Sequence, residues 1–381
     1  MYNCGKRVTN VVLRGMICAL VAIIVGGSAQ ASLAMRSVAI PMPATNLPGG
    51  PPIADDSQVV YVLDDPPTHA PDPANGPYFK NFVPRFFLVK LHNTATHIAA
   101  SKPRLLFTGS RGMGIGLGSM LGGWLIYEEY TAWYNPGGPW RMLARNLLSG
   151  KQIVLDSRDR EDMPSVTLPA SSDGRTAVWQ TFTVIGGRPT SIIRAYDFHT
   201  GRRRVLAQGG ALSKWEYSAP SVSGRSVIFE KRTFATQRSQ ILLKDLRTGL
   251  TRTLTPASGA NTEPTISGNI AVWKQGWGAG RAITVLNLLT GVRKIVNAPG
   301  VDFPQATAGR YVVFGELTGV VRDQIYDART GREDTLFAPH DGFATGGVTS
   351  AGGHTALYDI GRACGSPIFL CPGKLIVVAL P

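Results

Sequence analysis

The feature that most constrains this chain is a unit of about 45 residues that recurs along it. Each copy contains a glycine that is followed five residues later by an aromatic residue. The six pairs are Gly122–Tyr127, Gly174–Trp179, Gly224–Phe229, Gly268–Trp273, Gly309–Phe314 and Gly353–Tyr358. Successive glycines lie 52, 50, 44, 41 and 44 residues apart. Internal periods of this length are typical of solenoids and propellers.

A second element follows each of the first five pairs: Asp or Asn, two variable residues, then Ser or Thr and Gly. Its copies are Asn146–Gly150, Asp197–Gly201, Asp245–Gly249, Asn287–Gly291 and Asp327–Gly331. The short polar side chain can accept hydrogen bonds from nearby backbone amides, and glycine takes the positive φ that a tight turn needs. We therefore predict a hairpin turn at this element, and another turn at the glycine before each aromatic residue.

The segments between these turns predict short strands. Apolar residues alternate there, and no sustained helical periodicity interrupts them. The 44 glycines and 26 prolines of the 381 residues also argue against a mainly helical protein. Each unit has room for four short strands, which is the composition of a propeller blade. We predict an all-β, six-bladed β-propeller with four-stranded blades over residues 85–381, with a β-sandwich as the alternative.

The sixth unit is one strand short, because it ends in the apolar run 375–380 without a second turn. An incomplete blade would leave unpaired backbone groups at its edge. We therefore predict that an N-terminal strand closes the last blade. The two candidates are Val59–Leu63 and Phe86–Leu91, and we prefer the second because it lies nearer the repeats.

The order of these elements resembles the TolB-type propeller repeat. The pattern is Ser-x-Asp-Gly, an apolar strand with an aromatic residue, and then Asp-Leu-x-Thr-Gly. It is seen at Ser171–Gly174, Trp179 and Asp197–Gly201, and the turn at Asp245–Gly249 is also close to type. The resemblance covers about residues 109–381 and implies a TolB-like six-bladed propeller. At the position of Asp173, other copies have Ser223, Ser267 and Ala308.

Residues 1–31 have the pattern of a secretory signal. Three basic residues precede an uncharged apolar run, and Ala29–Ala31 is a small-x-small cleavage site. The apolar run is shorter than the ~20 residues that a membrane span needs. We therefore predict a cleaved signal peptide, and the minor alternative is an uncleaved signal anchor. Residues 32–84 hold 11 of the 26 prolines and are predicted to form an extended tether. We expect an exported monomer, periplasmic or secreted, with at most peripheral membrane contact.

The charge of the chain favours acidic partners. Cleavage after residue 31 would leave 36 basic against 25 acidic residues, so the net charge would fall from +14 to +11. A charge of this sign attracts anionic envelope polymers or acidic proteins. The chain has no motif that reads nucleic acid, and none is expected as a partner. We interpret the Arg202–Arg204 run as a solvated outer strand.

Two cysteines would remain after cleavage, Cys364 and Cys371. In an exported chain such a pair predicts one disulfide, with two free buried thiols as the alternative. Two cysteines alone do not make a zinc site, and His354 would offer only a third ligand. We expect no metal and no cofactor.

Catalytic motifs are weak in this sequence. There is no Gly-x-Ser-x-Gly elbow, and the glycine-rich run 109–118 has no phosphate-loop frame. Glu128, Glu230 and Asp359 directly follow repeated aromatic residues, and paired carboxylates at a central funnel would suit a glycosidase or lyase. The alternative is that these carboxylates cap strands structurally. We predict no catalytic residues.

Aromatic residues outside the repeated positions are the candidates for partner binding. They are Trp133, Tyr134, Trp140 and Trp277, and Arg281 close to Trp277 is a fifth candidate. Trp and Arg in exposed loops often anchor interfaces, whereas the alternative is that they fill space between blades. We predict a non-catalytic binding or scaffold module for a protein or an acidic envelope polymer. The alternative function is a carbohydrate-active enzyme with its site in the central funnel.

Overall fold

The structure is a computed structural model of the full chain. The residues described are 35–41, 52–64, 83–94, 97–130, 140–158, 170–186, 188–210, 214–276, 282–297, 306–317, 321–337, 343–352, 354–364 and 366–380. All of them belong to one compact unit, Leu33–Pro381. The predicted signal at residues 1–31 lies outside the described residues. Among the described residues we find no helix long and apolar enough to cross a bilayer.

Five consecutive antiparallel units of four strands make up residues 114–337, as the repeat predicts. The first two are β7 (Gly114–Leu121), β8 (Trp124–Tyr130), β9 (Trp140–Asn146), β10 (Gln152–Arg158) and β11 (Ser171–Ser172), β12 (Thr176–Ile185), β13 (Arg188–Asp197), β14 (Arg203–Gly210). The third and fourth are β15 (Trp215–Ser223), β16 (Ser226–Thr233), β17 (Ser239–Asp245), β18 (Thr251–Thr253) and β19 (Asn261–Ser267), β20 (Ile270–Gln275), β21 (Ala282–Asn287), β22 (Arg293–Asn297). The fifth is β23 (Ala306–Ala308), β24 (Tyr311–Leu317), β25 (Val321–Asp327) and β26 (Arg332–Phe337).

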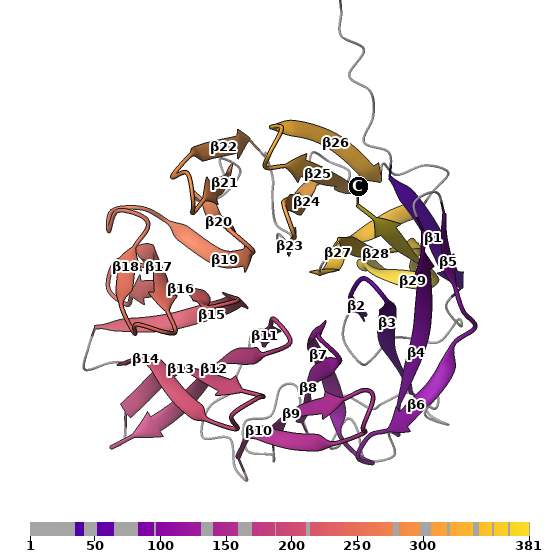
Figure 1. The fold of residues 1–381 in the computed structure, drawn as a ribbon, viewed down its shortest axis with the longest axis horizontal. Coiled ribbons are helices and arrows are strands. Elements are labelled where there is room, and N and C mark those ends of the chain that lie inside the picture. Colours follow the sequence, from indigo (N-terminus) through magenta and orange to yellow (C-terminus); the bar gives the residue numbers. More distant parts are fainter. Residues whose placement is uncertain are drawn as a thin grey trace, which may run out of the picture. The chain divides into compact units, whose positions relative to one another are not determined.

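Two further units form the seam where the ends of the ring meet. One contains β27 (Phe343–Gly352), β28 (Thr355–Cys364), β29 (Ser366–Ala379) and β1 (Arg36–Pro41). The other contains β2 (Ile53–Ala54), β3 (Gln58–Asp64) and β4 (Pro84–Asn93), and β4 pairs with both β5 (Ile98–Ala100) and β6 (Arg104–Thr108). In Figure 1 the units surround a common axis, with the first strand of each nearest the centre.

The predicted count of six blades is one short. The described residues form six hydrogen-bonded sheets, but the eight-stranded one consists of two four-stranded units joined by a single residue pair, Gly210 and Trp215. Seven units of described strands therefore surround the axis. Six correspond to the six glycine–aromatic copies, and β2–β6 is the additional one, which lacks both recurring elements.

An N-terminal strand completes the last unit, as predicted, but it is neither of the two candidates. β1 pairs with β29 from Arg36 to Pro41. The candidates pair with each other, as β3 and β4. The reason lies in their burial: Val59 to Val62 are all at most 2% exposed, so β3 is covered on both faces, as only an interior strand can be. In β1, Ile40 is buried and Ala39 exposed, which suits an outer strand.

The predicted tether at residues 32–84 is accordingly wrong in part, because β1, β2 and β3 belong to the ring.

The core lies between neighbouring units and not within any one of them. A cluster of buried apolar side chains fills each of the seven junctions around the ring, including the junction between β27–β29 and β2–β5. Each repeated aromatic residue whose side chain is described packs toward the preceding unit. These residues are Tyr127, Trp179, Phe229, Trp273 and Phe314, all at most 2% exposed. The aromatic repeat is therefore the packing element of the ring.

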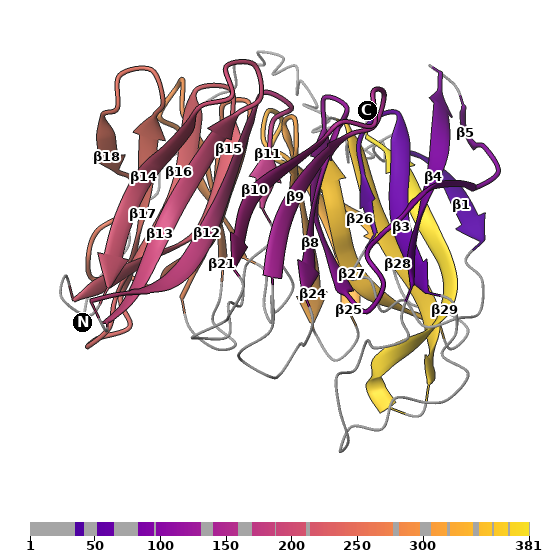
Figure 2. The same cartoon turned by 90° about the horizontal axis from the view of Figure 1, so that it is seen from below.

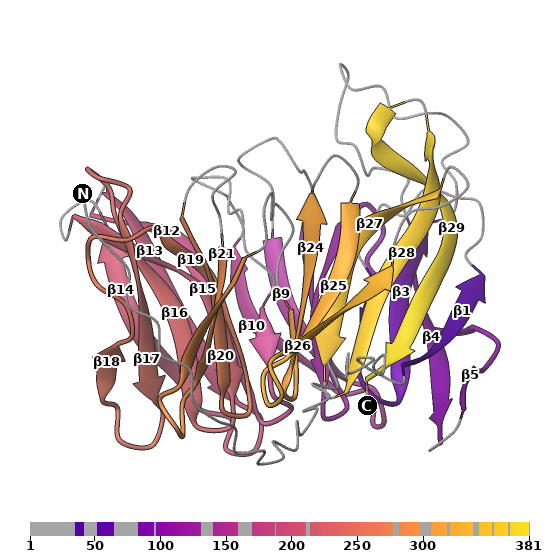
Figure 3. The same cartoon turned by 90° about the horizontal axis from the view of Figure 1, so that it is seen from above.

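One end of the ring carries the tight turns, and we call it the turn face. The β28–β29 hairpin extends beyond the opposite end (Figure 2, Figure 3). In the five complete units, the turn between the first and second strands lies beside the turn between the third and fourth. A backbone hydrogen bond joins the two turns in each, for example from Leu246 N to Arg225 O at 2.7 Å. The turn face is thus a repeated and ordered surface.

Candidate functional site: a basic face of the ring

The recurring Asp/Asn element forms the turn that the sequence predicts. In Asp245–Gly249, Asp245 Oδ1 accepts hydrogen bonds from the amides of Arg247 and Thr248, and Gly249 has a φ of 75°. The other four copies make the same bonds, with a positive φ at their glycines. A carbon side chain is strained at that φ, which explains the glycine.

Basic side chains are fixed on this face by the same turns. In three units an arginine directly follows the first turn glycine and pairs with the aspartate of the second turn. The pairs are Arg175–Asp197 at 3.8 Å, Arg225–Asp245 at 3.3 Å and Arg310–Asp327 at 3.4 Å. Backbone amides also hold the pKa values of Asp197 and Asp245 below their usual range. Burial pushes the pKa of Asp197 up, but the amides of Thr200 and His199 outweigh it, so the pKa falls below its usual value.

Arginines gather most densely between the units β11–β14 and β15–β18. A cavity of about 460 Å³ lies there, and we call it the arginine pocket. Its basic lining residues are Arg175, Arg202, Arg204, Arg225 and Arg247. Among the lining residues Asp197 is the only acid. All five arginines are exposed, and Arg204 also donates a hydrogen bond to Leu246 O at 3.1 Å across the junction.

An aromatic surface adjoins the arginine pocket. Trp124 stacks on Phe198 with ring centroids 4.3 Å apart and an interplanar angle of 9°. These two rings, with Arg175 and His199, line a cavity of about 400 Å³ between β7–β10 and β11–β14. Arg175 lines both cavities, so the aromatic and basic surfaces are continuous.

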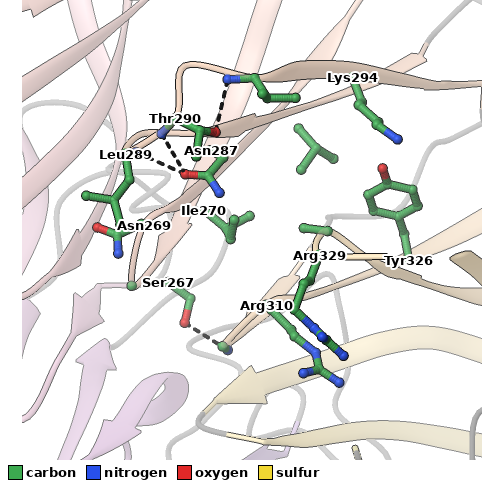
Figure 4. Close-up of a pocket in the computed structure, with 15 residues that line it drawn as sticks. Ser267, Asn269, Ile270, Asn287, Leu289, Thr290, Lys294, Arg310, Tyr326 and Arg329 are labelled. Atoms are coloured by element: carbon green, nitrogen blue, oxygen red, sulfur yellow. Dashed lines mark hydrogen bonds between the residues drawn. The ribbon is translucent and has the colours of Figure 1, made fainter. Parts of the chain in front are cut away.

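A third cavity, of about 520 Å³, lies between β19–β22 and β23–β26, and we call it the Tyr326 pocket (Figure 4). Apolar side chains, among them Ile270 and Val285, line part of it. Its basic lining residues are Lys294, Arg310 and Arg329. A fourth cavity, of about 430 Å³ between β2–β6 and β7–β10, has acidic and basic residues together.

Two of the three carboxylates that follow repeated aromatic residues, Glu230 and Glu128, have described side chains. Glu230 is 4% exposed, and its pKa is raised to about 7, chiefly because burial disfavours the charged form. The Glu263 amide donates a hydrogen bond to it, which favours the charged form. Glu128 accepts a hydrogen bond from Trp140 Nε1 at 3.4 Å. The side chain of Asp359 lies outside the described residues.

The predicted partner-binding residues have one clear outcome. Trp140 is 2% exposed and packs in the core cluster between β7–β10 and β11–β14, so the prediction that it is an exposed binding residue is wrong. Its ring fills the junction, which was the alternative. Trp133, Tyr134, Trp277 and Arg281 lie outside the described residues, and their role stays a prediction.

The disulfide also stays a prediction. Cys364 ends β28, and the register places Cys371 of β29 opposite Arg362, but neither cysteine side chain is described. Among the described residues, no group of three or more His, Cys, Asp or Glu side chains is placed to hold a metal ion.

Sequence reasoning missed the turn-face arginines. Arg202 and Arg204 of the predicted solvated run do lie in or beside an outer strand, yet both also line the arginine pocket. The signal in the sequence is the recurring Gly-Arg at Gly174, Gly224 and Gly309. Its meaning depends on the next unit in the ring, because each pocket takes its lining from two units.

The fold of this chain is similar to that of several solved structures. Neither a family model nor a curated protein sequence matches the chain. Similar solved structures include the acylaminoacyl peptidase of Pyrococcus horikoshii, with a TM-score of 0.54, 11% identity, and coverage of 89% of this chain and 51% of that chain. TolB of Acinetobacter baumannii has a TM-score of 0.40, 15% identity, and coverage of 84% and 79%. The β-propeller domain of the trilobed protease of Pyrococcus furiosus has a TM-score of 0.48, 9% identity, and coverage of 76% and 98%.

At these identities the likeness concerns the fold alone. The strand order and the similarity to the peptidase structure lead to one conclusion: this chain is an all-β protein with a β-propeller fold.

Proposed function

We propose that this chain is an exported, non-catalytic binding module, and that the turn face binds an acidic partner through the arginine pocket. The partner is an acidic envelope polymer or an acidic protein. The single observation that carries the proposal is the arginine pocket itself, in which five arginines and one carboxylate line a cavity of about 460 Å³.

The chemistry of arginine favours carboxylate, sulfate or phosphate groups. A guanidinium group is planar and can donate two parallel hydrogen bonds to two oxygens of the same anion. All five are exposed, and Arg202 and Arg247 stand on either side of the junction between β11–β14 and β15–β18. Like charges held close together repel each other, so an anionic partner stabilises the arrangement.

The repeat pattern supports a related proposal about ancestry. The Asp-x-x-Thr-Gly turns at Asp197, Asp245 and Asp327 share hydrogen bonds and geometry. We infer that the repeats are of the TolB type.

The experiment uses polygalacturonate, a linear polymer of carboxylated sugars, immobilised on a surface. The variant Arg202→Ala/Arg247→Ala removes two charges from the arginine pocket. The control Arg188→Ala/Arg238→Ala removes two charges from exposed positions on the same two units, at the ends opposite the turn face. We expect the pocket variant to bind at least about tenfold more weakly, since a hydrogen bond to a charged group contributes roughly 1.5–3 kcal/mol.

Binding of the wild type should weaken with rising salt, because the contacts are between exposed charges. Equal weakening in the pocket and control variants would show a non-specific charge effect and would overturn the assigned site. If poly-glutamate binds and polygalacturonate does not, the partner is an acidic protein. Binding of neither polymer by the wild type would contradict the proposal.

Export has a separate test. The chain is expressed with its native N-terminus in a Gram-negative host, and the periplasmic and cytoplasmic fractions are compared. We expect a mature periplasmic chain that begins at Ser32, as the small-x-small site at Ala29–Ala31 predicts. An uncleaved chain in the membrane fraction would identify a signal anchor instead.

A further inference from the structure

We propose that the Tyr326 pocket binds a small amphipathic anion, an apolar chain that carries one carboxylate or phosphate. This goes beyond the proposed function, because it concerns another junction of the ring and a small ligand in place of a macromolecule. The pocket lies between β19–β22 and β23–β26, at the turn face (Figure 4).

The size and lining of the pocket suit such a ligand. Its volume of about 520 Å³ is in the range of small-molecule sites, about 300–1,000 Å³. Ile270, Val285 and Val292 supply apolar wall, and Val292 is 55% exposed although it is a large apolar side chain. An apolar ligand chain would remove this surface from water.

The hydroxyl of Tyr326 is the second, independent sign of a ligand. Tyr326 is 3% exposed, and among the described residues its buried Oη has no hydrogen-bond partner. Buried hydroxyls in proteins are nearly always satisfied, because an unsatisfied one loses its hydration without compensation. In Figure 4 the Tyr326 hydroxyl points toward the side of the pocket where Lys294 ends. An anionic oxygen placed there would accept its hydrogen bond.

Gly331 keeps this corner open. A Cβ at that position would lie 2.8 Å from Lys294 Nζ and 3.9 Å from Tyr326 Oη. The ammonium and the hydroxyl thus converge beside one glycine, whose φ of 74° also disfavours any larger residue. The corner therefore combines a positive charge, a neutral donor and free space.

The other two cations have different tasks. Arg310 is engaged by Asp327 at 3.4 Å, which fixes its position at the pocket edge. Arg329 is exposed at the turn between β25 and β26, and Figure 4 shows it beside Arg310. Lys294 is therefore the cation that we assign to the ligand's anionic group, because its ammonium lies at the same corner as the Tyr326 hydroxyl.

Two other junctions provide matched comparisons within the same molecule. Tyr196 precedes the turn aspartate as Tyr326 does, but it lies at the junction between β7–β10 and β11–β14, where it is only half-buried and packs edge-on against Phe198 at 5.4 Å. Arg204 lies three residues after its turn glycine, as Lys294 does, and at the arginine pocket it donates a hydrogen bond to Leu246 O. The same positions are thus occupied by internal contacts in these two junctions and are open at the Tyr326 pocket.

The experiment titrates the full-length protein with octanoate by calorimetry. Acetate tests the anionic group alone, and 1-octanol tests the apolar chain alone. We expect saturable one-site binding of octanoate, at least about tenfold tighter than either comparison ligand, because both parts of the pocket contribute. Octyl phosphate, in place of octanoate, tells whether phosphate or carboxylate is preferred.

Variants locate the site. Tyr326→Phe and Lys294→Ala should each weaken octanoate binding by about five- to tenfold. The matched controls are Tyr196→Phe, at the equivalent position of another turn, and Arg238→Ala, an exposed basic residue at the end of the ring opposite the turn face, and they should leave affinity within about twofold. Thermal melts confirm folding, and Tyr326→Phe removes only a hydroxyl that has no hydrogen-bond partner among the described residues.

Three results would overturn the proposal: no saturable binding of octanoate, equal affinity for 1-octanol, or equal weakening in the matched controls. These results are separable from the fate of the proposed function, because polygalacturonate binding is measured with Arg202 and Arg247 variants. Loss of one activity leaves the other to be judged by its own ligand.

Discussion

The units β11–β14 and β2–β6 are both units of the same ring, but different residues form their turns. The first has a turn glycine, Gly174, and an aspartate turn at Asp197. The second has neither, and its β2–β3 turn depends on Asp55, whose Oδ1 accepts hydrogen bonds from the amides of Ser57 and Gln58. Both nevertheless pack a row of buried apolar residues against each neighbour. The comparison teaches that a blade needs interior packing on both faces, whereas the repeat marks only its turns.

The seam also differs from the other junctions in how its turn face is joined. Between the repeated units, serines of one unit cap the next: Ser223 Oγ accepts from Gly268 N at 2.9 Å, and Ser267 Oγ accepts from Gly309 N at 2.9 Å. At the seam, Asp56 accepts hydrogen bonds from His354 N and from Thr355 Oγ1 instead. The serines that replace Asp173 in other copies therefore bind the following unit.

The largest expected effect is at the seam. Ile40 of β1 is 1% exposed in the cluster that joins β27–β29 to β2–β5. Ile40→Ala should lower the free energy of unfolding by about 2–5 kcal/mol, because it leaves a cavity where the ring closes. Ala39→Ser, at the neighbouring exposed position, should change it by less than about 0.5 kcal/mol. Urea unfolding measures both, and equal midpoints for wild type and Ile40→Ala would show that β1 does not hold the ring together.

The next effect distinguishes two neighbouring repeated units. Glu230 and Gln180 occupy the same position in their strands, and both are buried. The pKa of Glu230 is raised to about 7 in the folded chain, so the folded state binds more protons than the unfolded state between about pH 4.5 and 7. The contribution of Glu230 to the free energy of unfolding should therefore be fully present below about pH 4.5. It should be lost as pH rises toward 7, which lowers the free energy of unfolding by about 3 kcal/mol.

Glu230→Gln, which makes this unit resemble its neighbour, should remove that fall and be the more stable protein at pH 8. The measurement is urea unfolding at pH 5 and pH 8. Parallel pH profiles for the wild type and Glu230→Gln would exclude Glu230 as the cause.

A third prediction compares the two kinds of turn directly. Asp327 is 1% exposed and Asp55 is 6% exposed, and each accepts two backbone amides. Asp327→Ala and Asp55→Ala should each destabilise by about 1–3 kcal/mol, since the amides lose their acceptor. Asp327→Asn should recover most of the loss, as Asn287 does in the preceding unit. A harmless Asp55→Ala would mean that the seam turn forms without its cap.

The smallest effect concerns the serine bonds between repeated units. Ser267→Ala removes the acceptor for Gly309 N and should destabilise by about 1 kcal/mol. Ser267→Thr keeps an oxygen acceptor and should stay closer to the wild type. Thermal unfolding compares the three proteins, and identical melting temperatures would show that this bond contributes nothing to the junction.

The turns were the most predictable part of the fold. The glycines at 174, 224, 268 and 309 and the Asp/Asn turns all have the predicted conformation, because a positive φ and an amide-capping side chain are local requirements. The identity of the closing strand was not predictable, because β1 and β3 both have strand-forming residues and differ only in how many neighbours cover them.

The candidate site was harder still. The arginines that follow Gly174 and Gly224 are 50 residues apart in sequence, and only the ring brings Arg175 and Arg225 to one cavity. Trp140 shows the converse. Its sequence context resembles an exposed aromatic loop, yet the neighbouring unit covers its ring.

The sequence by itself determined an all-β chain of repeated four-stranded units, since the period, the glycines and the alternation of apolar residues act within each unit. The tertiary structure decided the number of units, the strand that closes them and the pockets on the turn face. These depend on contacts between segments far apart in the chain, such as β1 with β29, and on burial that one unit imposes on the next. No local pattern carries that information, because each unit's faces are completed by its neighbours.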